Sequence, residues 1–307
     1  MISLPPPLQS GDTVGLLSPS GSTTAAALRQ GSQVLKSFGL QVVNAVYATH
    51  QYETFYRFSG SDTQRLSDLQ KMLDHPDLRA ILCLRGGYGL TRIQDRLDFT
   101  AFRRFPKWVV GFSDVTALHL QLHRLGYASL HAAMPAQFGR AGIAPALESL
   151  RAALLGEPFE VAAEAPTLCQ SGTAEGHIVG GNLSLVVNAL GTPSELDTEG
   201  KILLLEEVGE AAYAVDRMLI QLRRSGRFSG IIGCVLGSFT NESNAAYSGQ
   251  IRRVLEEHFG DAPFPVADGF PVGHTVRNEA ILLGVKAKLS VSETAATVRF
   301  AGRPAVA

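Results

Sequence analysis

The chain has 307 residues, of which 45 % are hydrophobic and 18 % are charged, and its formal net charge is −1. This length suggests two domains or one large one, and the hydrophobic fraction is enough to bury a sizeable core. The near-neutral balance argues against a nucleic-acid-binding protein, which usually carries a basic face, and against a disordered chain. No apolar run approaches the roughly 18 residues that a membrane helix needs, so we expect no membrane partner.

The start of the chain and its cysteines indicate a reducing compartment. The first seven residues lack the basic region and the apolar stretch of a signal peptide, so we expect no secretory leader. The cysteines Cys83, Cys169 and Cys234 are widely spaced, with no C-x-x-C pair. The first and last of them lie in apolar runs and are interpreted as small buried hydrophobes. We therefore expect a cytoplasmic location.

In the first half of the chain, short apolar runs alternate with segments of helical periodicity. Strands are predicted at residues 14–18, 40–46, 80–84 and 108–112, and helices at 24–38, 61–73 and 115–125. Ser61 or Asp62 is the expected N-cap of the second helix. Strands that are apolar on both faces and separated by helices favour a largely parallel sheet with helices on both faces. In such sheets ligands bind at the carboxyl ends of the strands.

The second half of the chain has a different order of predicted strands and helices. A helix is predicted at 145–155, and the segment 156–172 is expected to be irregular. Strands are predicted at 201–205, 231–236 and within 286–300, and helices at 215–224 and 248–259. We place an N-terminal α/β domain at 1–160, a linker at 161–175 and a C-terminal domain at 176–307.

Ser113 follows the apolar run 108–112, at the expected junction between a strand and a helix. A serine on such a turn projects its hydroxyl at the sheet edge, where the N-terminus of the next helix offers free N–H groups to an oxyanion. The match to the nucleophile elbow G-x-S-x-G is incomplete, because Val115 replaces the second glycine. Helix capping by Ser113 is the alternative interpretation.

The glycine-rich segment 85–89, Arg-Gly-Gly-Tyr-Gly, also follows a predicted strand. Its glycines allow the backbone to approach a ligand closely, and Arg85 is suited to bind a carboxylate. The segment is neither a dinucleotide fingerprint, which would need glycine at Arg92, nor a P-loop. A tight glycine turn with a solvent-facing arginine is the competing interpretation.

Two further segments carry groups suited to acid–base chemistry. Glu206 and Glu207 follow the apolar run 202–205, and strand alternation directs their side chains to opposite faces, so at most one can point into a site. His274 lies in a predicted loop, and histidine is the usual general base at neutral pH. Each segment taken alone is more typical of a solvated surface.

The remaining histidines suggest little chemistry. His119 and His123 are four residues apart on a predicted helix, but no acidic residue accompanies them, so we favour a partly buried helix face over a zinc site. His131 and His177 are expected to line a cleft. Surface positions are predicted for His50, His75 and His258. We expect no metal or organic cofactor.

Taken together, these segments resemble the LD-carboxypeptidase family, which includes muropeptide LD-carboxypeptidases and microcin C self-immunity peptidases. The similarity spans nearly the whole chain. It is carried by short blocks in the right order, at residues 8–20, 85–89, 107–119, 180–193, 205–217 and 273–284. Two positions depart from the family pattern: His131-Ala-Ala133 stands where His-Gly-Pro is common, and Leu283 precedes Gly284 where proline is common.

The resemblance implies a role for each matched position. Ser113 corresponds to the nucleophile, His274 to the base and Glu206 to the acidic member. The resemblance also implies oxyanion donors at the backbone N–H groups of Gly87 and Asp114. The expected substrate-binding residues are Arg85, Tyr88, Gly181 and Asn182.

The family fold implies a smaller, β-rich C-terminal domain, an active site between the domains and a homodimer. The favoured substrate is a murein tetrapeptide, from which the enzyme removes a terminal D-alanine. One alternative is a peptidyl or aminoacyl nucleotide of the microcin C type, and another is a ligand-binding module that has lost turnover. Both departures lie outside the three catalytic positions, so the expected chemistry is kept, and the one at His131-Ala-Ala133 bears on the identity of the substrate because it affects the pocket.

Overall fold

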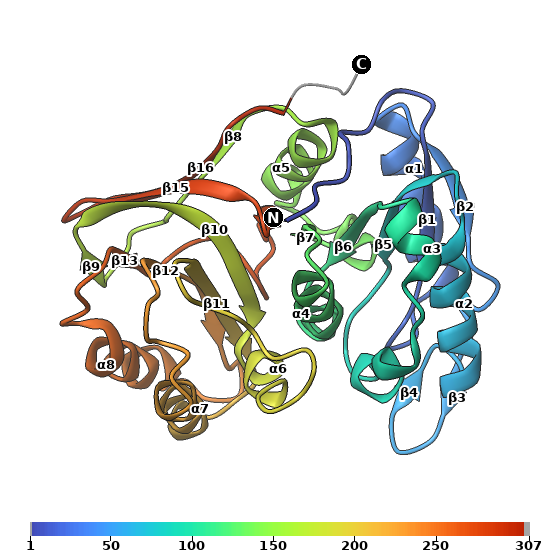
Figure 1. The fold of residues 1–307 in the computed structure, drawn as a ribbon. Helices are drawn as coiled ribbons and strands as arrows, with labels where there is room; N and C mark the ends of the chain where they lie inside the picture. Colours follow the sequence, from blue (N-terminus) through green and yellow to red (C-terminus); the bar gives the residue numbers. More distant parts are fainter. Residues whose placement is uncertain (1, 304–307) are drawn as a thin grey trace.

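The computed structural model describes residues 2–303, which form two lobes, each built on one sheet (Figure 1). The first sheet has the strand order β14-β7-β6-β5-β1-β2, and every neighbouring pair is parallel except β14 with β7. Its strands are β1 (Thr13–Leu17), β2 (Gln41–Asn44), β5 (Leu78–Cys83), β6 (Trp108–Gly111), β7 (Ser129–His131) and β14 (Ile281–Leu283). The predicted parallel sheet of the N-terminal half is therefore present.

Helices and short turns surround this sheet. The helices are α1 (Ala25–Ser37), α2 (Asp62–Asp74), α3 (Thr100–Arg104), α4 (Thr116–Arg124) and α5 (Ala144–Leu155). The 3₁₀ turns are η1 (Leu90–Arg92), η2 (Gln94–Arg96), η3 (Ser113–Val115) and η4 (Pro135–Gln137), and a small hairpin is formed by β3 (Tyr52–Glu53) and β4 (Arg57–Phe58). Local sequence sets the helix ends: Ser61 and Gln64 form a capping box on α2, and Gly156 ends α5 in the left-handed region.

The second sheet has the order β8-β16-β15-β10-β11-β12-β13-β9. Strands β10 to β13 are mutually parallel, while the pairs on either side of them are antiparallel. Its strands are β8 (Phe159–Ala162), β9 (Cys169–Gln170), β10 (Gly172–Asn182), β11 (Ile202–Val208), β12 (Gly233–Thr240), β13 (Val266–Ala267), β15 (Lys286–Val291) and β16 (Ala296–Phe300). Helices α6 (Leu183–Asn188), α7 (Ala212–Arg224) and α8 (Tyr247–Phe259) belong to the same lobe.

The expectation of an irregular segment at 156–172 is wrong, because this segment contains β8 and β9. Strand β8 pairs with β16, and the rings of Phe159 and Phe300 stack with centroids 4.9 Å apart. The pairing partner of β8 lies about 140 residues further along the chain, so local sequence gives no sign of it. The first sheet in turn contains a strand from the C-terminal half of the chain, because β14 forms its edge beside β7.

A shared core joins the two lobes. One cluster of buried side chains runs from Trp108 in β6 through Leu150 in α5 to Leu204 in β11 and Phe300 in β16. Helix α4 lies between the sheets and contacts β10 and α6 (Figure 1). Because α4 follows directly after β6, the end of β6 is held at the junction of the lobes. None of the described helices has the length and apolar character required to cross a bilayer.

Candidate active site

Ser113 begins the 3₁₀ turn η3 at the carboxyl end of β6 and has a φ of +63°. Only Ala165 shares a positive φ among the non-glycine residues of the described chain. This conformation strains a residue with a Cβ, and such strain is concentrated at functional sites. Gly86 lies so near that a Cβ there would approach the Ser113 Cβ to 3.0 Å. The serine is thus presented on a tight turn beside the glycine-rich segment 85–89.

His274 connects Ser113 to Glu206 through two hydrogen bonds. The His274 Nε2 atom lies 3.1 Å from the Ser113 Oγ, and His274 Nδ1 lies 2.7 Å from the Glu206 Oε2. The Glu206 side chain is fully buried, and its Oε1 has no hydrogen-bond partner among residues 2–303. With the Nδ1 proton donated to this carboxylate, Nε2 is left to accept the Ser113 hydroxyl proton. The order hydroxyl, imidazole, carboxylate is the arrangement of a serine catalytic triad.

The neighbouring carboxylates have different partners, which answers a question that the sequence left open. Glu206 faces His274, whereas Glu207 points to the other side of β11 and accepts hydrogen bonds from the backbone N–H and the hydroxyl of Ser184, each at 2.7 Å. The Asn182 amide and the Val208 N–H also donate to Glu207. Burial raises the pKa of Glu207. Its contacts hold the start of α6 against β11.

The loop that carries His274 is fixed at its base. The Asn278 Oδ1 accepts the Gly273 N–H at 2.7 Å, and the Glu279 N–H donates to the Pro271 carbonyl at 2.7 Å. Gly273 has a φ of +102°, and a Cβ at this position would lie 2.7 Å from the Glu206 Cγ. A glycine is therefore required for the loop to pass this close to the buried carboxylate.

The segment 85–89 is clamped by a buried arginine that sequence reasoning did not single out. The fully buried Arg65 guanidinium donates to the Gly89 carbonyl at 2.9 Å and to the Pro19 carbonyl at 2.6 Å. The Asp114 carboxylate accepts the Leu90 N–H at 2.9 Å and the Ser20 hydroxyl at 2.6 Å. Burial raises the pKa of Asp114. These contacts fix the glycine-rich segment relative to Ser113.

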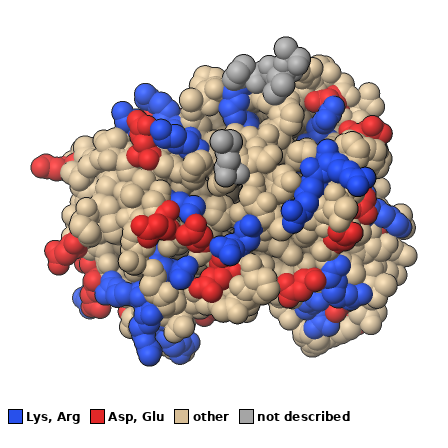
Figure 2. Space-filling view, in the orientation of Figure 1, with Lys and Arg blue, Asp and Glu red and all other residues tan. Residues whose placement is uncertain are grey.

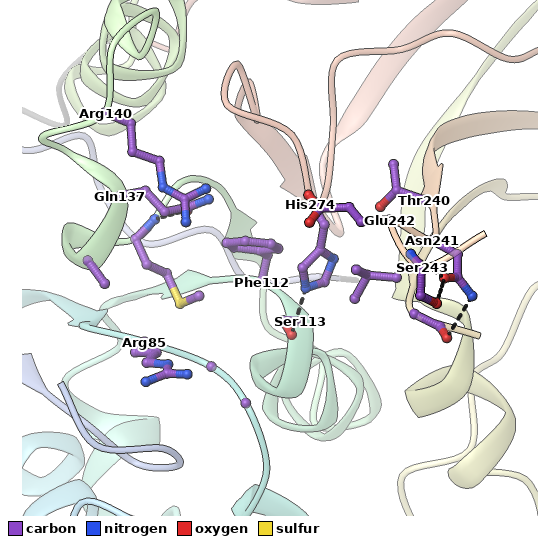
Figure 3. Close-up of a pocket in the computed structure, with 16 residues that line it drawn as sticks. Arg85, Phe112, Ser113, Gln137, Arg140, Thr240, Asn241, Glu242, Ser243 and His274 are labelled. Atoms are coloured by element: carbon purple, nitrogen blue, oxygen red, sulfur yellow. Dashed lines mark hydrogen bonds between the residues drawn. The ribbon is translucent and has the colours of Figure 1, made fainter. Parts of the chain in front are cut away.

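These groups open onto a cavity of about 660 Å³ between the lobes (Figure 3). Ser113, His274 and Phe112 lie on its floor, and the Phe112 ring packs edge-on against the His274 imidazole with centroids 4.9 Å apart. The other lining residues come from both lobes: Arg85, Gly86, Gly87, Met134, Ala136, Gln137, Arg140, Val208, Gly209, Thr240, Asn241, Glu242 and Ser243. Sequence reasoning missed Arg140 and Glu242, because both lie in loops without a recognisable motif.

The expected substrate-binding residues fall into two groups. Arg85 lines the cavity, and its Nη1 donates to the Ser22 carbonyl at 2.9 Å. Tyr88 lies outside the lining, in an aromatic cluster with Phe55, Tyr56 and Phe58.

The other two expected substrate contacts, Gly181 and Asn182, are buried away from the cavity. The Asn182 side chain caps α6 and bonds Glu207, and a Cβ on Gly181 would meet Thr116. Neither residue lines the cavity, and the Asn182 N–H donates to the Thr116 Oγ1 at 3.1 Å, a contact that holds β10 against α4.

The other histidines are mostly structural. His119 is buried and its Nε2 lies 2.9 Å from the Gly111 carbonyl, as a partly buried helix face predicts, and burial lowers its pKa to about 4. His131 does not line the cavity, because it is fully buried in β7, where burial lowers its pKa to about 3. The predicted surface position of His258 is wrong: its side chain is almost fully buried and bonds Asp216 at 2.8 Å.

No cluster of three or more potential metal ligands occurs among the described residues. On the face shown in Figure 2, acidic and basic side chains are interspersed, and no continuous basic area is visible. The reactive groups that line the site are the Ser113 hydroxyl and the His274 imidazole, with Glu206 behind the imidazole and the Arg85 and Arg140 guanidinium groups nearby.

Comparison with known protein families decides which group of proteins this arrangement belongs to. Residues 14–132 match the LD-carboxypeptidase N-terminal domain, and residues 175–289 match the LD-carboxypeptidase C-terminal domain. The chain belongs to the LD-carboxypeptidase family. This confirms the resemblance found in the sequence, and it makes the protein a peptidase.

Relatives in the LD-carboxypeptidase family match over nearly their whole length. The probable murein peptide carboxypeptidase of Bacillus subtilis (strain 168) is 34 % identical, over 96 % of this chain and 93 % of its own. The murein tetrapeptide carboxypeptidase of Pseudomonas aeruginosa is 30 % identical, over 90 % of this chain and 92 % of its own.

Solved structures show the same LD-carboxypeptidase fold. Muramoyltetrapeptide carboxypeptidase from Oxalobacter formigenes superposes with a TM-score of 0.84 at 28 % identity, covering 95 % of this chain and 99 % of that one. A MccF-like protein from Bacillus anthracis has a TM-score of 0.87 at 24 % identity, covering 98 % of this chain and 100 % of that one, which is a likeness of fold alone.

Proposed function

We propose that this protein is a serine carboxypeptidase that removes the terminal D-alanine from murein tetrapeptides, cutting the bond between an L-configured centre and D-alanine. The proposal is carried by the hydrogen-bonded series from Ser113 through His274 to Glu206 at the floor of a cavity. Relatives named murein peptide and murein tetrapeptide carboxypeptidase support the choice of substrate. The corresponding role is peptidoglycan recycling in the cytoplasm. The homodimer expected from the family resemblance stays a prediction.

In this mechanism His274 Nε2 takes the Ser113 proton as the hydroxyl oxygen attacks the scissile carbonyl. Glu206 holds the Nδ1–H and stabilises the imidazolium that forms. His274 then gives its proton to the nitrogen of the leaving D-alanine, which leaves an acyl-enzyme on Ser113. Water, activated by the same histidine, releases the shortened peptide. Because the Glu206 carboxylate is fully buried and its other oxygen has no partner in the described chain, its interaction with the imidazolium is little screened.

The negative charge that develops on the carbonyl oxygen needs N–H donors. We assign this role to the backbone amides of Gly87, which lines the same cavity as Ser113, and of Asp114, which follows Ser113 in the sequence. Gly87 lines the cavity with a φ of +103°, and Asp114 lies in the first turn of η3. One such donor is worth roughly 3 kcal/mol of barrier. Arg65, by holding the Gly89 carbonyl, keeps the Gly87 amide in place.

An exopeptidase must also bind the terminal carboxylate of its substrate, and we assign this to Arg85. Its guanidinium lies in the same cavity as Ser113, and within residues 2–303 it donates only one hydrogen bond, from Nη1 to the Ser22 carbonyl. A guanidinium binds a carboxylate through two parallel hydrogen bonds. Arg85→Gln is therefore expected to raise KM for the tetrapeptide at least tenfold.

The test is mass spectrometry of a murein tetrapeptide incubated with wild-type protein, Ser113→Ala and the matched pair Glu206→Gln and Glu207→Gln. We expect loss of one alanine with wild type, no loss with Ser113→Ala, and a far larger rate reduction in Glu206→Gln than in Glu207→Gln. Loss of alanine in Ser113→Ala at the wild-type rate would refute the mechanism. Turnover of a peptidyl nucleotide but not of the tetrapeptide would move the assignment to the microcin type, and turnover of neither would favour a binding module.

A further inference from the structure

The small hairpin β3–β4 is attached to the loop that follows β1. The Ser22 N–H in this loop donates to the Arg57 carbonyl of the hairpin at 3.1 Å, and Gly21 forms an antiparallel bridge with Phe58. Figure 1 shows the hairpin at the lower edge of the first lobe, outside the parallel sheet. Its place is therefore set by backbone contacts to the loop after β1.

The loop after β1 also holds the glycine-rich segment 85–89. The Gly21 N–H donates to the Gly86 carbonyl at 3.0 Å, and the Ser22 carbonyl accepts from the Arg85 Nη1 at 2.9 Å. The loop thus connects the hairpin to the backbone that carries the assigned carboxylate-binding and oxyanion-binding groups.

The Tyr56 hydroxyl, at the turn of the hairpin, lies directly beside Gly87. A Cβ added to Gly87 would collide with the Tyr56 Oη, and a Cβ added to Gly21 would lie 3.0 Å from the same atom. The Tyr56 oxygen therefore occupies the space that a side chain at residue 87 would need. Gly87 is in turn a glycine for two reasons, this close approach and its φ of +103°.

Neighbouring rings hold the Tyr56 side chain in this position. The Tyr56 ring packs edge-on against Phe58, with centroids 5.1 Å apart, and against Tyr88, with centroids 5.8 Å apart. Phe58 is buried, and Tyr56 is half-buried. Because both contacts are edge-to-face pairs of the favoured geometry, the hydroxyl approaches Gly87 from a defined direction.

We propose that Tyr56 is a positioning residue for the oxyanion donor, because its hydroxyl restricts the orientations open to the Gly87 N–H. Two consecutive glycines precede Tyr88, and glycine backbone has more conformational freedom than that of any other residue. Tyr56 supplies the restraint that a side chain on Gly87 would otherwise give. Tyr56 is outside the cavity lining, so it acts on the substrate through Gly87. The inference rests on the proposed function, from which it takes the role of Gly87.

The expected effect is on kcat rather than on KM. Removal of an oxyanion donor lowers kcat by about 10²–10³-fold in serine peptidases. A misdirected N–H loses part of that factor, because a hydrogen bond weakens as its angle departs from linearity. The carbonyl of the bound substrate carries less negative charge than the transition state, so substrate binding is little affected.

The test compares Tyr56→Phe and Tyr56→Ala with Tyr52→Phe and Tyr52→Ala, which change an exposed tyrosine of the same hairpin. With the murein tetrapeptide we expect kcat to fall about threefold in Tyr56→Phe and about 30-fold in Tyr56→Ala, while KM stays within about twofold. Labelling of Ser113 by a fluorophosphonate, whose phosphoryl oxygen also gains negative charge, is expected to slow by similar factors. The Tyr52 variants are expected to match wild type in kcat, KM and labelling rate.

A double variant separates positioning from a general loss of structure. Gly87→Ala is expected to lower kcat by at least about 100-fold, because its Cβ collides with the Tyr56 hydroxyl and its φ is strained. In that background Tyr56→Ala removes the collision, so it is expected to raise kcat about fivefold, although the same change lowers kcat in the wild-type background.

Wild-type kcat and labelling rates in Tyr56→Ala, or an equal fold reduction by this change with and without Gly87→Ala, would overturn the positioning role and leave the proposed function standing. A change confined to KM would overturn it as well. Wild type that is labelled at Ser113 but does not cleave the tetrapeptide would refute the proposed substrate, while the labelling rates would still decide the role of Tyr56.

Discussion

Replacement of Gly273 by alanine tests how closely the histidine loop must pass the buried carboxylate. Gly273 has a φ of +102°, where an alanine is strained. A Cβ at this position would lie 2.7 Å from the Glu206 Cγ and 2.8 Å from the Glu206 Cβ, distances that packed atoms do not sustain. Either the loop or Glu206 must move, and both carry the bond between His274 Nδ1 and Glu206 Oε2.

The expected magnitude has two parts. Backbone strain at an alanine with this φ lowers the free energy of unfolding by about 1–2 kcal/mol. Overpacking of a well-filled site lowers it by a further amount of about 1–3 kcal/mol. We expect Gly273→Ala to lower the free energy of unfolding by about 2–5 kcal/mol. Loss of the carboxylate–imidazole contact is expected to lower kcat by roughly 10²–10⁴-fold.

The assay is urea denaturation followed by steady-state kinetics on the murein tetrapeptide, with Gly226→Ala as the control. Gly226 has a φ of +78° and open space around the position of a Cβ, so this variant reports the backbone strain alone. We expect Gly226→Ala to lose about 1–2 kcal/mol of stability and to keep wild-type kcat. If Gly273→Ala matched the control in both stability and kcat, the close approach to Glu206 would be refuted.

Three further changes have defined outcomes. Ser113→Ala and Ser113→Gly are both expected to be inactive. Because Ser113 has a φ of +63°, the glycine variant is expected to be about 1 kcal/mol more stable than the alanine variant in urea denaturation. Equal stability of the two variants would contradict the backbone strain. Arg65→Met is expected to lose about 2–4 kcal/mol of stability and to lower kcat more than it changes KM, because buried carbonyls such as that of Gly89 lose their donor. Burial lowers the pKa of His131 to about 3 from 6.5, so below pH 6.5 the unfolded chain binds a proton that the folded chain does not, and stability falls as the pH decreases toward 3. His131→Leu is expected to flatten this dependence by up to about 1.4 kcal/mol per pH unit, measured by urea denaturation between pH 7 and 5; an unchanged slope would contradict the burial of a neutral histidine.

Much of the fold was predictable because local rules determine it. The buried parallel strands β1, β5 and β6 each contain a short apolar run, and α2 begins with a capping box at Ser61. The positions of Ser113 and Arg85 at strand ends followed from the same patterns, since the carboxyl ends of parallel strands share one edge. Strands whose partners are distant in sequence, such as β8 and β14, carry too few residues to be recognised alone.

The parts of the site that could not be predicted depend on tertiary packing. Alternation shows that Glu206 and Glu207 face opposite ways, but which of them meets His274 depends on how β11 lies against β10 and β12, where the register shifts between Leu205 and Glu207. Asn182 belongs to a block that matches the family, yet its side chain is used to cap α6. Arg140 and Glu242 become relevant only when the two lobes face each other across the cavity.

The central claim, that His274 activates Ser113 as a nucleophile, is tested most directly by labelling with a serine-reactive fluorophosphonate. Wild type, His274→Ala and Ser113→Ala are incubated with the probe, and the labelled residue is located by tandem mass spectrometry. We expect a single label on Ser113 in wild type, labelling at least 100-fold slower in His274→Ala, and none in Ser113→Ala. Folded wild type that stays unlabelled at Ser113, or equal labelling rates with and without His274, would contradict the proposed mechanism.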